Sequence, residues 1–123
     1  MNSGRAVFVG RWRIISVEGW EQSDLDLVVP AFIEFDSREG GGFQFCALSG
    51  DMDYRVSTED DRPLIEWSWL GDDDGTDVAG RGWAYREDES LVGRIFLHGG
   101  DEFPFRASQE GPRKTARKSR KRL

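Results

Sequence analysis

Four aspartates lie close together at positions 72, 73, 74 and 77, within the stretch SWLGDDDGTDVAGRGWAY that runs from residue 68 to residue 85. Carboxylate oxygens are ligands that calcium prefers. An EF-hand loop also needs a glycine at its sixth position and a bidentate glutamate at its twelfth. Counted from Asp72, glycine comes fourth and Trp83 occupies the twelfth position. The spacing argues against a calcium site, and we interpret the segment as a solvated hairpin tip without a metal or cofactor.

His98 is the only histidine, and Asp101 follows it three residues later. A histidine and an aspartate together can activate a serine nucleophile. The candidate serines are Ser16, Ser49, Ser57, Ser68 and Ser90. None of them stands in the glycine-flanked turn that presents a hydrolase nucleophile. Asp51 and Asp53 share one strand face, which is an expected coincidence in a chain with 23 acidic residues. We therefore predict no catalytic residues and no enzymatic activity.

Cys46 is the only cysteine, so the chain forms no internal disulfide and no zinc site with several thiolates. We interpret it as a small, buried apolar residue. No apolar run approaches the roughly 20 residues that a membrane-spanning helix needs, and none near residue 1 resembles a signal peptide. We expect a soluble cytoplasmic protein that does not enter a membrane.

The net charge of −6 conceals two chemically different parts. Residues 111–123, GPRKTARKSRKRL, hold seven basic and no acidic residues, so the other 110 residues carry 10 arginines against 23 acidic residues, or −13. A block of like charges without apolar periodicity cannot offset the entropy cost of ordering. We predict a folded domain over residues 1–110 and a basic tail, disordered in isolation, over residues 111–123. The tail residues available for contacts are Arg113, Lys114, Arg117, Lys118, Arg120, Lys121 and Arg122.

Apolar residues in the first 110 positions recur at every second residue, which is the pattern of half-buried strands. The connecting segments are mostly short, polar and rich in glycine, as expected between neighbouring antiparallel strands. Closing such a sheet on itself removes its two exposed edges. The sequence predicts an all-β fold, a small antiparallel meander β-barrel of about eight strands. The expected strands are residues 8–20, 31–36, 43–48, 51–56, 64–70, 80–86, 91–98 and 102–107; residues 21–30 are left for a helical turn or a lid.

The same alternation assigns side chains to the two faces of the sheet. The residues expected to point inward together are Ile33, Phe35, Phe43, Phe45, Tyr54, Val56, Ile65, Trp67, Trp69, Trp83, Tyr85, Ile95, Leu97, Phe103 and Phe105. The residues expected to face water are Glu34, Gln44, Arg55, Glu66 and Ser68.

A glycine and a tryptophan, Gly10 and Trp12, open the first strand, and Arg106 lies in the last. This pattern resembles the Gly-x-Trp motif and late arginine of the calycins, the lipocalin-like barrels. The resemblance implies that Trp12 plugs the base of the barrel and that Arg106 packs across its ring through a cation–π contact. Residues 8–107 are also similar to small bacterial proteins of unassigned function, a resemblance that implies no activity.

Two functions from different classes remain open. In the first, the barrel is a non-enzymatic interaction module: its acidic body binds a protein partner, and its tail binds nucleic acid without sequence specificity, or another acidic surface. A tail that only solubilises the protein, or that folds back onto its own acidic loops, is equally compatible with the sequence. In the second, the barrel binds a small hydrophobic ligand, as a lipocalin does. The residues expected to line that site are Trp67, Trp69, Trp83, Tyr85 and Phe45.

Overall fold

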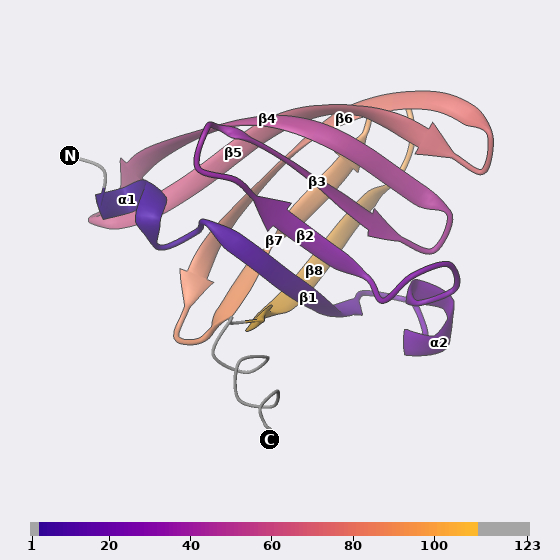
Figure 1. Cartoon of the computed structure of the whole chain (residues 1–123), viewed down its shortest axis with the longest axis horizontal. Coiled ribbons are helices and arrows are strands. Elements are labelled where there is room, and N and C mark those ends of the chain that lie inside the picture. The colour runs from indigo at the N-terminus through magenta and orange to yellow at the C-terminus, as the bar shows by residue number, and fades with distance from the viewer. Residues whose placement is uncertain (1–2, 111–123) are drawn as a thin grey trace, which may run out of the picture.

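The computed structural model describes residues 3–110 and confirms the all-β prediction. Eight antiparallel strands form a closed barrel in which each strand pairs with the next and β8 pairs with β1 (Figure 1). The strands are β1 (Gly10–Val17), β2 (Phe32–Phe35), β3 (Gly40–Phe45), β4 (Leu48–Glu59), β5 (Arg62–Asp73), β6 (Thr76–Glu87), β7 (Ser90–Leu97) and β8 (Glu102–Glu110). The helices are α1 (Ser3–Ala6) and α2 (Gln22–Leu25).

Two-residue turns make the central strands longer than the sequence predicted. Asp74 and Gly75 have φ angles of 51° and 94° and join β5 directly to β6. Asp60 and Asp61, with φ angles of 52° and 65°, join β4 to β5 in the same way. Positive φ at both central residues is typical of type I′ turns, whose twist matches that of the flanking strands. The polar segments expected to be loops around these turns are therefore largely strand.

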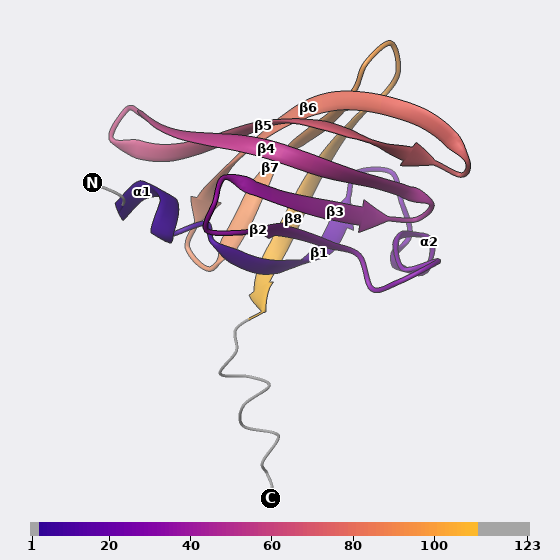
Figure 2. The same ribbon diagram turned by 45° about the horizontal axis from the view of Figure 1, so that its top comes forward.

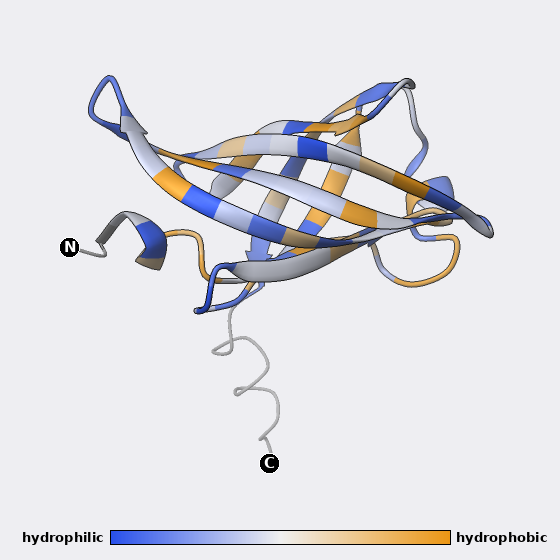
Figure 3. Cartoon of the chain, turned by 90° about the horizontal axis from the view of Figure 1, so that it is seen from above, coloured by the Kyte–Doolittle hydropathy of each residue, from blue (hydrophilic) through white to orange (hydrophobic). Residues whose placement is uncertain are grey.

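The interior of the barrel is apolar, as the two-residue alternation predicted. Figure 3 shows polar and apolar bands alternating along the strands. The predicted inward residues that are buried are Ile33, Phe35, Phe43, Phe45, Tyr54, Ile65, Trp67, Trp69, Ile95, Phe103 and Phe105. Val56 and Leu97 are partly buried against this core. Burial of so much apolar surface supplies the main stabilisation of the fold.

The two helices lie at opposite ends of the barrel (Figure 2). The end at α1, here called the base, holds the fully buried Phe8 and Trp12. The end at α2, here called the mouth, is covered by Trp20, whose ring meets those of Phe45 and Phe103 edge to face at centroid distances of 5.9 and 6.2 Å. The segment between β1 and β2 thus contains one helical turn and lies across the mouth.

An ion pair fixes this mouth segment to the wall of the barrel. Arg13 donates two hydrogen bonds of 2.7 Å to the carboxylate of Asp26, which also accepts from the backbone N–H of Ala31 at 2.8 Å. The Arg13 hydrogen bonds, helped by Ala31, hold the pKa of Asp26 well below its usual range. The backbone N–H of Cys46 donates to the carbonyl of the buried Leu25 at 2.7 Å. We expected Cys46 to be buried, but it lies partly exposed in the β3–β4 turn with a φ of 55°.

Candidate functional site

Three of the five residues predicted to line a ligand site lie inside the barrel, where they contact other rings. The ring centroids of Trp67 and Phe35 are 5.5 Å apart, and those of Trp69 and Phe43 are 5.1 Å apart. Phe45 stacks on Phe43 at 6.2 Å. The rings form two groups: Phe35 also contacts Phe8 at the base, and Phe45 also contacts Trp20 at the mouth. Aromatic packing of this kind occupies the interior of a small barrel.

The other two, Trp83 and Tyr85, lie on the outer face, so their inward assignment is wrong. The inward positions of β6 are instead taken by Gly80, Gly82 and Ala84. The indole of Trp67 lies directly against Gly82, its cross-strand partner: a Cβ added there would be 2.5 Å from Trp67 Cε2 and Cζ2. Glycine and alanine occupy the inward positions of β6 because the indoles of the β5 tryptophans fill the space that larger side chains there would need.

The base has the predicted plug but a different arginine above it. Trp12 is fully buried and donates its indole N–H to the carbonyl of Phe8 at 2.9 Å. The guanidinium over its ring belongs to Arg86, 5.4 Å from the centroid. Arg106, assigned to this role from the sequence, donates to Glu87 at 2.8 Å. It points away from the interior because its neighbours Phe105 and Ala107 take the inward positions of β8.

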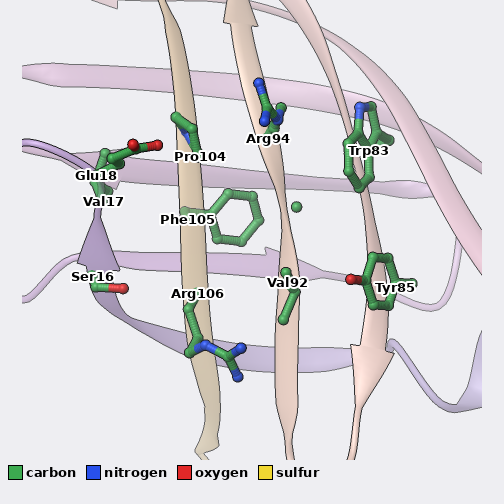
Figure 4. Close-up of a pocket in the computed structure, with 11 residues that line it drawn as sticks. Ser16, Val17, Glu18, Trp83, Tyr85, Val92, Arg94, Pro104, Phe105 and Arg106 are labelled. Carbon is green, nitrogen blue, oxygen red and sulfur yellow. The ribbon is translucent and has the colours of Figure 1, made fainter.

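Trp83 and Tyr85 form one wall of a hollow on the outer face of β6, β7, β8 and the end of β1, here called the outer groove (Figure 4). The groove has a volume of about 420 Å³. The two ring planes lie within 9° of parallel, with centroids 6.2 Å apart. The lining residues are Ser16, Val17, Glu18, Trp83, Tyr85, Val92, Gly93, Arg94, Pro104, Phe105 and Arg106. This site was missed because both rings were assigned to the core.

Two guanidinium groups lie in the groove, and each has a carboxylate partner at its edge. Arg94 pairs with Glu102, and Arg106 pairs with Glu87 at 2.8 Å. All four side chains are 43–55% exposed. Exposed ion pairs contribute little to stability, about 0–1 kcal/mol. Both arginines can therefore exchange their carboxylates for an anionic group of a ligand at low cost.

A second hollow, of about 470 Å³, lies on the opposite side of Trp83. Its lining includes Glu66, Ser68, Arg81 and Gly82. The guanidinium of Arg81 lies 4.4 Å from the centroid of Phe96, and that of Arg62 lies 4.5 Å from the centroid of Tyr85. Trp83 is thus a ridge between two hollows on a face rich in aromatic rings and arginines.

The aspartate cluster is the tip of the β5–β6 hairpin, where we expected it. The carboxylate of Asp72 accepts the backbone N–H of Gly75 at 3.0 Å, which closes the turn. Within residues 3–110, no three histidine, cysteine or acidic side chains are placed to hold a metal ion. His98 lies at the β7–β8 turn and donates its backbone N–H to Ala79.

The tail residues predicted to make contacts, from Arg113 to Arg122, lie outside the described residues. Glu110, the last residue described, ends β8 at the base, opposite Arg11 of β1. The outer groove and the start of the tail therefore share strand β8. In the part of the chain that the structure describes, no helix is long and apolar enough to cross a membrane.

Comparison with known proteins gives no relative. The chain matches no protein-family model, no curated protein and no solved structure.

Proposed function

We propose that this chain is a non-enzymatic interaction module that binds an acidic macromolecular partner through the outer groove and the basic tail. The observation that carries the proposal is the position of Trp83 and Tyr85 beside Arg94 and Arg106 in one open hollow. Tryptophan, tyrosine and arginine are the residues that dominate binding energy in interfaces. The closed sheet places this set on its outer face while the interior is occupied by other rings.

The distribution of charge supports an acidic partner. Strand β8 contributes Arg106 to the groove and leads to residues 111–123, which add seven positive charges. The rest of the body is strongly acidic, so the attraction has to come from these two regions. Binding should therefore weaken steeply as salt is added, because counterions compete for the same contacts.

Elution from heparin–agarose with a salt gradient tests the proposal. Arg94→Ala/Arg106→Ala should elute at lower salt than the wild type. The matched control is Arg11→Ala/Arg55→Ala, which removes two exposed, ion-paired arginines that do not line the outer groove. Both double variants have the same net charge. If the two variants elute at the same salt concentration, the groove has no special role in binding and the proposal is rejected.

We also propose that the chain is a calycin. The meander order of its eight strands and the buried Trp12 beneath an arginine, Arg86, support this membership. The arginine comes from β6 rather than from the last strand.

A second candidate function is binding of a small hydrophobic ligand inside the barrel, which requires the rings that fill the interior to move apart. It is favoured by the buried indole N–H groups of Trp67 and Trp69, which find no acceptor among residues 3–110. A buried donor without a partner costs about 1–3 kcal/mol, and the carboxylate of a fatty acid would relieve that cost. Titration with dodecanoate should then shift the fluorescence of the wild type but not of Trp67→Phe/Trp69→Phe. An unchanged wild-type spectrum at saturating dodecanoate would reject this function.

A further inference from the structure

We infer that the acidic partner is single-stranded nucleic acid, with bases stacked on Trp83 and Tyr85 and phosphates bound by Arg94 and Arg106. This inference rests on the function proposed above and names its ligand. Single-strand binding proteins combine a cationic groove with aromatic rings on which successive bases stack. The outer groove has these two rings and two arginines within one hollow, together with one acidic residue, Glu18. The arginines serve a phosphate chain once they exchange their partners Glu102 and Glu87 for it.

The spacing of the rings favours an extended single strand. Their centroids are 6.2 Å apart and their planes are within 9° of parallel. Neighbouring bases in a duplex rise by only about 3.4 Å and cover each other's faces. Two protein rings at nearly twice that spacing can each stack on one base only where the bases are unstacked from each other. A purely acidic peptide such as poly-glutamate has no ring to place on Trp83 and Tyr85, so it would contact the arginines and leave the two rings without an aromatic partner.

The charges of the molecule also select against duplex nucleic acid. A duplex offers this surface a dense row of phosphates and no free base faces, and the body, at −13, repels phosphates. A single strand offsets that repulsion through stacking. A nucleic-acid strand lying along β8 toward the base passes Pro104 and Arg106 and reaches Glu110, after which the sequence adds the seven positive charges of residues 111–123. The tail increases attraction to any phosphate chain, whereas the groove supplies the preference for unpaired bases.

Fluorescence anisotropy with the full-length chain tests the inference. The probes are a fluorescein-labelled 15-nucleotide DNA of mixed sequence, the RNA of the same sequence, and the DNA as a duplex. Both single strands should bind at least tenfold more tightly than the duplex. Trp83→Leu/Tyr85→Leu should weaken single-strand binding at least tenfold and remove this preference, since each stacked base contributes substantially.

The matched control is Trp20→Leu/Phe32→Leu, which removes the tryptophan at the mouth and the partly buried ring of Phe32 in β2. Neither ring lines the outer groove, so this variant should change binding less than twofold. Circular dichroism melts of both variants verify that they are folded. Wild-type affinity in Trp83→Leu/Tyr85→Leu, or equal binding of duplex and single strand, would overturn the inference. Equally tight binding of poly-glutamate would overturn it too and would identify an acidic protein as the partner.

The inference and the function proposed above fail in different ways. Suppose that Arg94→Ala/Arg106→Ala weakens heparin binding while Trp83→Leu/Tyr85→Leu leaves DNA binding unchanged. The proposal of an acidic partner then holds, and the inference that this partner is single-stranded nucleic acid fails. If neither pair of residues matters, both proposals fail.

Discussion

Gly82→Ala should destabilise the barrel, because the new methyl group would enter the space that the Trp67 indole occupies. The added Cβ would lie 2.5 Å from two ring carbons and 2.7 Å from Nε1, well inside van der Waals contact. Overpacking of this kind costs about 1–3 kcal/mol. Replacing a glycine restricts the unfolded chain and returns about 0.4–1 kcal/mol. The free energy of unfolding should therefore fall by about 1–2 kcal/mol.

The cause is isolated by a double-mutant cycle with Trp67→Leu, which removes the ring atoms above Gly82. In that background Gly82→Ala should be neutral or should stabilise by about 0.4–1 kcal/mol. The coupling between the two sites is then about 1–3 kcal/mol, within the range for residues in direct contact. Urea unfolding followed by far-ultraviolet circular dichroism measures all four free energies. The same cost for Gly82→Ala in both backgrounds would refute the packing of Trp67 on Gly82.

Three further outcomes follow from the base, the mouth and the tail. Trp12→Ala removes a fully buried ring and should cost about 3–5 kcal/mol in urea unfolding; a loss below about 1 kcal/mol would contradict its role as the base plug. Asp26→Asn should destabilise the protein at pH 7. The pKa of Asp26 is lower in the folded state than in the unfolded state, where it is about 3.9. The contribution of this carboxylate to the free energy of unfolding is therefore complete above about pH 3.9 and is lost as the pH falls further. The gap between wild type and variant should therefore shrink between pH 5 and pH 2, and a gap that does not depend on pH would contradict this. Deletion of residues 111–123 should leave the melting temperature unchanged in calorimetry while lowering retention on single-stranded DNA at low salt, and a changed melting temperature would show that the tail packs on the barrel.

Most of the fold could be predicted because two-residue alternation is a local property of each strand. It correctly placed Phe43, Tyr54 and Trp69 inside, and short polar connections gave the antiparallel order. Strand ends were less accurate. The glycines at residues 40–42 were assigned to a loop but form the start of β3, because their backbone pairs with β4.

The face of β6 was misassigned because hydrophobicity alone favours an inward Trp83. Packing against the neighbouring strand decides otherwise, and that information is not local. One signal in the sequence could have found it. Asp74-Gly75 is a strong two-residue hairpin turn, and such a turn fixes the register so that Trp67 lies opposite Gly82. Directly opposed residues share a face, so an inward Trp67 requires an inward Gly82 and an outward Trp83.

The register of the β5–β6 hairpin alone does not identify Arg86 as the arginine above Trp12. Arg86 follows the inward residues Gly80, Gly82 and Ala84 along β6, so its position depends on the same register. Its guanidinium also donates to the carbonyl of Val7 at 3.3 Å, a contact 79 residues apart in the chain. Only closure of the barrel brings these groups together.

The five tryptophans report on different parts of the molecule, which allows one measurement to locate the bound ligand. Trp12 is at the base, Trp67 and Trp69 are in the interior, Trp20 is at the mouth, and Trp83 is in the outer groove. A ¹⁹F NMR titration of 5-fluorotryptophan-labelled protein with the single-stranded 15-nucleotide DNA follows all five, assigned by single Trp→Phe substitutions. The Trp83 resonance should shift with increasing DNA while those of Trp12, Trp67 and Trp69 stay unchanged. A shift of the interior resonances with no change at Trp83 would contradict binding in the outer groove.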